Sequence, residues 1–390
     1  MTKNRLLYSA IIVAAIIFVF FDEGRTSYTF LYAVLMMPVI SWLMSKLSLH
    51  NLSVMQAIDK NLIVKGEETK YHIIAVNKVF FISPVFSFVF SKSHNAIQSE
   101  AENIMLALPA QSERDISFNL TCGYRGVYYV GLESVQALDY LGLFSLSRSW
   151  EDKTQLVVYP RVVEIAHFPL SMSLLSKNFS RLEIREEDYS AISDIRPYLP
   201  SDNIKRIHWK LSAKKNSLIV KNFENTALNS MTVVLDRMQV IGDEQYSIIA
   251  EDKIVEIVVS LCHYCLRKMI PVDFFYGEEP VTAVSLTEFN NIYTCAAHVN
   301  FTSDVKLDSS LGMLLSTQSG KINLVVVTSH MTGILMDELS SAYYFGHYVI
   351  LVYIPPQQES DEAVEMVNFL KEIGMHVYRI NINDNILDHF

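Results

Sequence analysis

The sequence is poor in cysteine and has no excess of positive charge. Only four of its 390 residues are cysteines, which excludes the disulfide framework that staples small secreted domains. Lysine and arginine number 32 against 42 acidic residues, so binding of nucleic acid by the chain as a whole is not expected. The phosphate-loop, dinucleotide-binding, zinc-protease and serine-hydrolase motifs are also absent. The residues therefore predict neither a cofactor nor a recognisable catalytic centre.

Two of the cysteines, Cys262 and Cys265, form a C-x-x-C pair. Such a pair serves either redox or metal chemistry, or contributes two small apolar side chains to the buried face of a helix. The apolar residues that lead up to the pair recur every three or four positions, which is the spacing of a helix. No second cysteine pair lies near enough in the sequence to complete four zinc ligands, so we favour the buried helix face.

Long apolar runs occur only near the N-terminus. Residues 6–21 and 28–44 carry no charge, and each run approaches the ~20 residues that a spanning helix needs. A cleaved signal peptide is the rival interpretation of the first run, but a second run follows at once and no small-x-small cleavage site is visible. We therefore predict a transmembrane hairpin over residues 1–48, with a six-residue break at 22–27.

The charges that flank the two runs predict their orientation. Lys3 and Arg5 precede the first run and Lys46 follows the second, whereas the connecting segment carries Asp22, Glu23 and Arg25. The positive-inside rule then places both ends of the hairpin in the cytoplasm. We expect a cell-membrane protein with two spans and cytoplasmic soluble domains.

Residues 50–165 consist of short β-rich runs separated by turn signals, which predicts an all-β sandwich. Glycines at 126, 131 and 142 suit turns with positive φ or places where two backbone segments pass closely. Arg125, next to Gly126, fits either an anion site or, as we favour, a structural arginine at a sheet edge.

Residues 180–390 alternate apolar strand patterns with helical patterns, which predicts a doubly wound α/β domain with a mainly parallel sheet. The expected strands are 229–236, 271–277, 321–329, 347–355 and 375–380, and the expected helices are 244–269, 285–297, 305–317, 334–344 and 360–374. Ser360 and Gly374 are the expected cap residues of the last helix. Asp236 ends the first strand, where such folds bind ligands, but Met238 and Val240 offer no oxygen side chains for a hard cation. We therefore predict no metal site there.

The segment Pro200–Glu224 carries six lysines and arginines around Trp209, in a chain that is acidic as a whole. A structural plug that buries the tryptophan ring between two domains is the interpretation we favour. A binding face for a partner protein or an anionic bilayer comes second. A catalytic or nucleic-acid role comes last, because nucleic acid would need several aromatic side chains among the basic ones.

The same segment resembles the bacterial family called domain of unknown function 58. The resemblance rests on "YRGVYYVG", "DYLGLF" and "VYPR", on "LIVKNFE", and on Arg196, Tyr198, Asp202, Arg206, Ile207, Trp209, Ser212 and Ala213. Ser201 replaces the family glycine before the aspartate, and Tyr140 and Leu141 replace the Pro-Phe of the second piece. The hallmark segment, 194–224, is placed at the start of the α/β domain.

The resemblance implies a von Willebrand factor A-like fold for the last domain. Such domains often carry a D-x-S-x-S metal site, of which Asp236 would be a degenerate remnant. It also implies a genomic setting beside MoxR-type AAA+ ATPases and membrane transglutaminase-like proteins, with no settled biochemical activity.

These observations predict a membrane-anchored interaction or scaffold protein that works with an AAA+ ATPase and binds no nucleic acid. The interaction residues would be those of the hallmark together with one arginine of the sandwich: Arg196, Tyr198, Asp202, Arg206, Trp209, Lys210 and Arg125. The alternative is a cell-envelope hydrolase or transferase that uses Asp236 with Asp202 or His330.

Overall fold

The structure, a computed structural model, divides into two compact units, Met1–Pro160 and Arg161–Phe390. It describes residues 2–21, 24–90, 97–99, 104–170, 192–197, 207–215, 217–223, 230–277, 279–302, 307–317 and 321–390.

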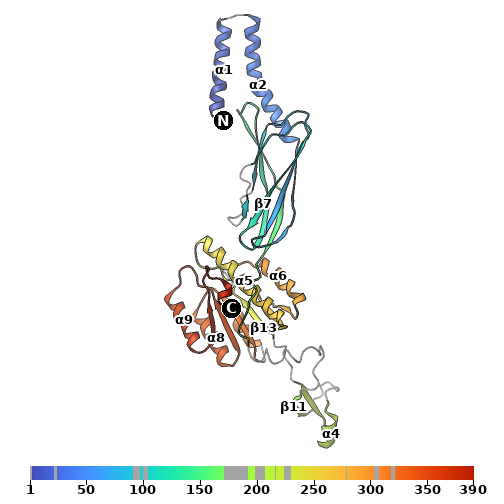
Figure 1. Cartoon of the computed structure of the whole chain (residues 1–390), viewed down its shortest axis with the longest axis vertical. Coiled ribbons are helices and arrows are strands. Elements are labelled where there is room, and N and C mark those ends of the chain that lie inside the picture. The colour runs from blue at the N-terminus through green and yellow to red at the C-terminus, as the bar shows by residue number, and fades with distance from the viewer. Residues whose placement is uncertain are drawn as a thin grey trace. The chain divides into compact units, whose positions relative to one another are not determined.

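The first unit begins with two antiparallel helices, α1 (Thr2–Phe21) and α2 (Arg25–His50), which Figure 1 shows side by side. Both helices are long and apolar enough to cross a membrane, as the sequence predicts. Their contacts include an edge-to-face pair of Phe18 and Phe30, 6.3 Å apart, and a 2.7 Å hydrogen bond from the Tyr8 hydroxyl to the Val34 carbonyl. The helices therefore pack as a hairpin.

The break between the helices is shorter than the predicted six residues. Arg25, Thr26 and Ser27 belong to the first turn of α2, and the Ser27 hydroxyl donates to the carbonyl of the N-cap residue Gly24. The second helix also runs past residue 44 to His50, where the side-chain amide of Asn51 donates to the Leu47 carbonyl. Apolar content alone does not predict where α2 begins and ends, because polar residues, Ser27 and Asn51, form the hydrogen bonds of its first and last turns.

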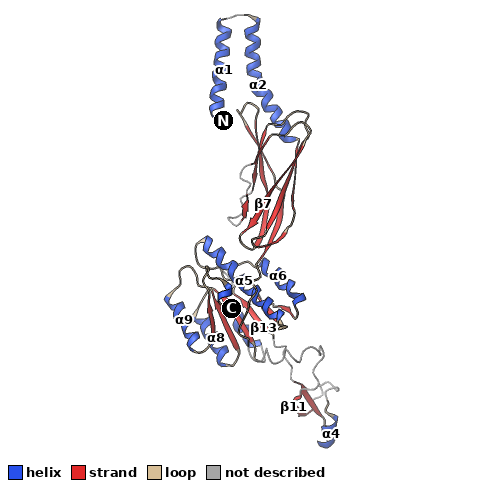
Figure 2. Ribbon diagram, in the orientation of Figure 1, coloured by secondary structure: helices blue, strands red, loops and turns tan. Residues whose placement is uncertain are grey.

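Within the described residues, ten strands follow the hairpin, in two sheets that Figure 2 shows in red. The first sheet has the order β1-β3-β7-β5, and the second has the order β2-β10-β8-β4-β6 with β9 paired to β8. The strands are β1 Leu52–Ile58, β2 Leu62–Val64, β3 Glu68–Asn77, β4 Val85–Phe90, β5 Ile97–Ser99, β6 Ile104–Leu106, β7 Glu113–Cys122, β8 Gly126–Leu138, β9 Ser145–Ser149 and β10 Lys153–Tyr159.

One hydrophobic core joins the two sheets. In β3 every second residue is buried, so that Tyr71 and Ile73 point inward whereas Lys70 and His72 do not. They pack in one cluster with Phe86 and Phe88 of β4 and Leu132 of β8. This is the predicted sandwich, with one departure from an antiparallel arrangement, because β2 pairs with β10 in parallel.

The second unit contains a six-stranded sheet of order β15-β14-β13-β16-β17-β18. Its strands are β13 Met231–Leu235, β14 Val272–Phe275, β15 Val281–Ala283, β16 Asn323–Thr328, β17 Tyr348–Tyr353 and β18 His376–Arg379. Its helices are α5 Glu244–Arg267, α6 Phe289–His298, α7 Leu307–Thr317, α8 Gly333–Tyr344 and α9 Asp361–Glu372, with short 3₁₀ turns η2 Leu286–Glu288 and η3 Ile386–Asp388. The short antiparallel edge strand β15 is not foreseen from the sequence, since three residues carry no periodicity.

Alternate residues of the central strands enter different cores. Val233 and Val325 pack with α5 and α6, whereas Val234 and Val326 pack with α7, α8 and α9. The helices therefore cover both faces of the sheet, which is the predicted α/β architecture. The predicted caps of α9 are also confirmed, because Ser360 accepts from the Ala363 amide and Gly374 has a φ of 93°.

The segment after the last strand of the sandwich belongs to the second unit. Ile165 and Phe168 are buried in the α/β core, and the Val163 amide donates to the Ser260 hydroxyl of α5 over 2.9 Å. The predicted sandwich boundary at 165 therefore extends five residues past the end of the first unit at Pro160.

Candidate functional site

Asp236 lies directly after β13, at the carboxyl edge of the parallel sheet, and is only 3% exposed. One carboxylate oxygen, Oδ2, accepts a 2.6 Å hydrogen bond from the Thr328 hydroxyl at the end of β16. The other oxygen, Oδ1, accepts from the Met238 amide over 2.9 Å. Both oxygens thus hold protein donors and link the ends of two neighbouring strands.

Within the described part of the chain, the groups hydrogen-bonded to Asp236 are donors. Met238 contributes its backbone amide to the site, which is a donor rather than a ligand. Across the described ranges, no three histidine, cysteine, aspartate or glutamate side chains are grouped so as to hold a metal ion. The chemistry of this strand end is that of a structural hydrogen-bond centre.

Ser329 and His330 lie beside Asp236, and the three residue types are those of a Ser-His-Asp catalytic triad. In such a triad the serine and the carboxylate contact different ring nitrogens of the histidine. Here the Ser329 hydroxyl lies 3.0 Å and Asp236 Oδ2 lies 3.6 Å from the same atom, Nδ1 of His330. The other nitrogen, Nε2, is buried without a protein hydrogen-bond partner, and Ser329 is 1% exposed. This arrangement cannot pass a proton from serine to aspartate through the ring.

The hallmark segment forms a small substructure of its own. Strands β11 (Ile192–Pro197) and β12 (Ile219–Phe223) pair antiparallel, and helix α4 (Trp209–Lys215) lies between them in sequence. The buried Ser212 of α4 accepts a 2.9 Å hydrogen bond from the Ile219 amide of β12. Ser212 therefore has a structural role that ties the helix to the strand.

The predicted interaction residues of this segment are only partly within the described structure. Arg196 lies in β11 and Lys210 in α4, with backbone positions alone. Tyr198, Asp202 and Arg206 lie outside the described residues.

Trp209 is 62% exposed at the start of α4. The described residues of its own unit therefore do not cover the ring, and the plug between two domains stays a prediction. Lys214 and Lys215 at the end of the same helix are exposed as well. The helix thus exposes a large aromatic side chain at its start and two ammonium groups at its end.

Arg125 occupies the turn between β7 and β8. Its carbonyl accepts a 3.2 Å hydrogen bond from the Tyr128 hydroxyl, which also donates to the Tyr124 carbonyl. This turn lies at the end of the sandwich opposite to the hairpin, since the other end of β8 leads to Asp139. The backbone of Arg125 is thus part of a closed turn.

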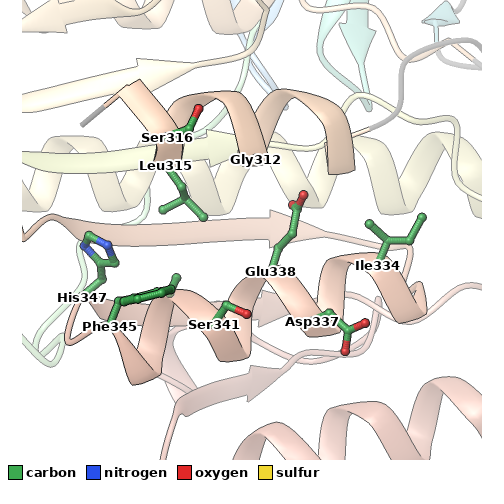
Figure 3. A pocket seen from close by; sticks show the side chains of 10 residues that line it. Gly312, Leu315, Ser316, Ile334, Asp337, Glu338, Ser341, Phe345 and His347 are labelled. Carbon is green, nitrogen blue, oxygen red and sulfur yellow. The ribbon is translucent and has the colours of Figure 1, made fainter. Parts of the chain in front are cut away.

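An open groove of about 450 Å³ runs between α7 and α8. Figure 3 shows Leu315 of α7 and Glu338 of α8 pointing into the space between the helices. A Cβ atom on Gly312 would lie 2.7 Å from Oε1 of Glu338, so glycine permits this close approach of the two helices. Ile334 and Phe345 line the same groove and are 61% and 79% exposed. The groove combines apolar and acidic side chains, and the sequence gives no signal for it.

The C-x-x-C pair has the predicted structural role. Cys262 and Cys265 are fully buried in α5, and burial raises the pKa of both thiols, to about 12 for Cys265. Thiols with a raised pKa are poor nucleophiles and poor metal ligands at neutral pH.

A polar junction that no sequence pattern indicates joins the helical hairpin to the sandwich. Asp139, the first residue of "DYLGLF", is 3% exposed and accepts a 2.8 Å hydrogen bond from the Ser41 hydroxyl of α2. The same carboxylate accepts from the amides of Leu141 and Phe144, at 3.2 and 2.6 Å. Asp139 therefore closes its own loop and fixes that loop to the second helix.

The first helix and the end of the second join the same junction. Arg5 Nε donates to the Leu143 carbonyl over 2.8 Å, and Gly142, at a φ of 68°, lies where a Cβ atom would be 2.3 Å from the Asn4 amide nitrogen. Arg148 of β9 donates to the carbonyls of Leu49 and His50 at the end of α2. Serines 41, 45 and 48, spaced by four and three along α2, are the signal that could have revealed this face.

The comparisons with known proteins agree with the sequence motifs. Residues 194–268 match the family described as "Protein of unknown function DUF58". The uncharacterized protein YeaD of Bacillus subtilis is 21% identical over 271 residues, which cover 67% of this chain and 65% of that protein. The chain thus spans somewhat less than two thirds of the length of this relative.

Solved structures resemble only parts of the chain. The cupredoxin domain of amoB from Nitrosocaldus yellowstonii is 10% identical with a TM-score of 0.20, over 30% of this chain and 96% of that domain. A cohesin module from a Clostridium perfringens family 33 glycoside hydrolase is 11% identical with a TM-score of 0.17, over 27% and 96%. Scores this low carry no argument about function. The family match over residues 194–268 and the distant relative both support the DUF58 family that the sequence motifs indicate.

Proposed function

We propose that the chain is a membrane-anchored protein whose sandwich and α/β unit stand in the cytoplasm and bind other proteins. The proposed partners are an AAA+ ATPase of the MoxR type and a membrane transglutaminase-like protein. This setting is what the family resemblance implies, and the geometry of the strand ends is compatible with binding rather than with catalysis.

The junction at Asp139 is the observation that carries the proposal. Hydrogen bonds from Ser41 and Arg5 join both apolar helices to a folded domain, so that the hairpin acts as a built-in anchor. Lys3, Arg5 and Lys46 all lie at this end of the hairpin. By the positive-inside rule, that end and the sandwich attached to it face the cytoplasm.

The α/β unit is the proposed binding module. Its sheet order, with one antiparallel edge strand beside parallel ones, is compatible with the von Willebrand factor A-like fold that the resemblance implies. The unit offers two surfaces with exposed apolar side chains, the groove at Phe345 and the basic helix with Trp209. Exposed aromatic side chains of this kind are typical anchors of protein interfaces.

The alternative function, an envelope hydrolase or transferase, draws no support from the proposed residues. Asp236 and Ser329 both lie near the same ring nitrogen of His330, which is not the arrangement of a catalytic triad. Asp202 lies outside the described residues. No observation on this site favours an enzyme over a binding module.

The first test is the membrane topology. A reporter that is active only in the cytoplasm and one that is active only after export are fused after Phe390 in the full chain. We expect activity from the cytoplasmic reporter alone. Activity of the exported reporter would contradict the proposed ATPase partnership and would favour an envelope function.

The second test is partner binding. The purified MoxR-type ATPase of the same organism is sedimented with proteoliposomes that carry the full chain, with and without ATP. We expect co-sedimentation that weakens several-fold in Trp209→Ala or Phe345→Ser. Leu387→Ser is the matched control, because Leu387 is 47% exposed on η3, which packs with the opposite face of the sheet. Equal binding by all three variants, or none by the unmodified chain, would refute a role for these surfaces.

A further inference from the structure

Two loops of the sandwich present apolar side chains at the end that carries the hairpin. Phe80 and Ile82, in the loop between β3 and β4, are 80% and 64% exposed. Tyr140, in the loop between β8 and β9, is 44% exposed. We call Phe80, Ile82 and Tyr140 the loop patch.

The backbone beneath the loop patch is fixed by buried polar groups. The side-chain amide of Asn77 donates to the carbonyls of Phe81 and Pro109, at 3.1 and 2.7 Å. The Ser83 hydroxyl accepts from the Leu108 amide over 2.7 Å, and the Ser83 amide donates to the Leu108 carbonyl. Asn77 and Ser83 are 1% and 2% exposed. A rigid loop thus holds large apolar side chains outward, where water would otherwise surround them.

The loop patch lies at the level where the two apolar helices meet the sandwich. The Tyr140 hydroxyl donates to the Ile82 carbonyl over 2.6 Å, which joins the two loops. The residue after Tyr140, Leu141, offers its carbonyl to Asn4, and Leu143 offers its own to Arg5. The patch is therefore continuous with the polar ends of the hairpin.

The helix ends at this level have the composition of a membrane–water interface. The ammonium group of Lys46 lies 5.0 Å from the ring centre of Trp42. Trp42 lies in the last turn of the apolar run 28–44 of α2, and Lys46 follows that run by two residues. Tryptophan, tyrosine and basic side chains gather where hydrocarbon gives way to headgroups. Phenylalanine and isoleucine beside such a belt suit the boundary between headgroups and acyl chains.

We propose that the loop patch inserts into the cytoplasmic face of the lipid bilayer and forms a third membrane contact beside α1 and α2. This proposal rests on the membrane anchoring proposed above. The first unit would then contact the bilayer through α1, α2 and the loop patch. Phe80 and Ile82 would lie about 5–10 Å into the boundary between headgroups and acyl chains.

The test measures the depth of single nitroxide labels in the full chain. A Cys295→Ser background removes the one cysteine that is not buried. Labels are placed by Phe80→Cys in the patch, by Ile17→Cys in α1 and by Leu62→Cys as the control. Leu62 is 55% exposed in β2, at the end of the sandwich away from the hairpin. The chain is reconstituted into vesicles of phosphatidylethanolamine and phosphatidylglycerol, and collisions with oxygen and with a water-soluble nickel chelate are compared.

We expect a several-fold higher oxygen-to-nickel ratio at position 80 than at position 62, with the highest ratio at position 17. Tyr140→Cys, as a second patch position with unchanged thermal unfolding, guards against a local effect of the label and should agree with position 80. A buried signal at 17 with water-like signals at 80 and 140 would overturn the proposal and leave the anchor intact. A water-like signal at 17 would overturn the anchor and the patch together.

Discussion

Each unit of this protein contains a buried aspartate at the end of a strand, and the two differ in what they connect. Asp139 and Asp236 are both 3% exposed, and each accepts one hydroxyl and at least one backbone amide. Asp139 joins an apolar helix to the sandwich, whereas Asp236 joins two strands of one sheet. A carboxylate in a position typical of catalysis can thus be structural, while one in the loop after β8 connects two parts of the first unit.

The largest expected effect is that of Asp139→Ala. The substitution leaves the Ser41 hydroxyl and two loop amides without their acceptor, so the free energy of unfolding should fall by about 3 kcal/mol. Chemical unfolding of the full chain in detergent micelles measures the change. Asp115→Ala is the control, because Asp115 in β7 has a 58% exposed side chain, and it should cost less than ~0.5 kcal/mol. A loss at Asp139 no greater than at Asp115 would show that the junction contributes nothing.

Asp236→Ala should have the second largest effect. Loss of the acceptor for Thr328 and Met238 should lower the free energy of unfolding by about 2 kcal/mol, with membrane attachment unchanged. Melting temperatures with added magnesium and with a chelator should be equal, since both oxygens already hold protein donors. A magnesium-dependent rise in melting temperature that Asp236→Ala abolishes would reveal a working cation site and reverse the comparison.

Two serines on one face of α2, Ser41 and Ser45, test how much the hydrogen bond to Asp139 contributes to the free energy of unfolding. Ser41→Ala removes a donor to Asp139 and should cost about 1 kcal/mol. Ser45→Ala removes a buried hydroxyl that has no protein hydrogen-bond partner, so stability should stay the same or rise. The two unfolding curves are measured side by side in the same detergent. Equal costs would mean that the helix face, and not the Asp139 bond, sets the effect.

The smallest effect concerns an exposed carboxylate. Asp243 caps α5, and hydrogen bonds from the Tyr246 amide and the Gln357 side chain lower its pKa from 3.8. Its contribution to stability is therefore fully present above that value and is lost as the pH falls through the lowered pKa of the folded state. Asparagine also caps helices, so Asp243→Asn should keep the cap and weaken the dependence of unfolding on acid pH. An unchanged pH profile would exclude Asp243 as a contributor.

The sequence predicts the architecture well because periodicity reports burial directly. The alternation in β3 and the apolar runs of β13 and β16 are visible in the residues, and Ser360 and Gly374 mark the ends of α9. Asp139 could not be interpreted in the same way. Its partner Ser41 is 98 residues away, and no local pattern indicates which distant hydroxyl a carboxylate will meet.

The surface features could not be predicted from the sequence either, because they also depend on how separate segments pack. A short helix that is tied to β12 through Ser212 leaves the Trp209 ring largely exposed, and no local pattern of the sequence indicates this exposure. The groove at Gly312 lies between α7 and α8, and no local sequence pattern predicts how these two helices pack together.

Helix α2 also has a mechanical consequence. It spans 26 residues, about 39 Å, with Pro38 in its interior, and its last turns lie against the sandwich and contribute Leu49 to the sandwich core. In the membrane-anchored arrangement proposed above, a force applied to the sandwich would reach the bilayer by tilting the helix pair rather than by stretching a flexible tether. The proposed ATP-driven partner would then move the helix pair whenever it pulled or twisted this domain.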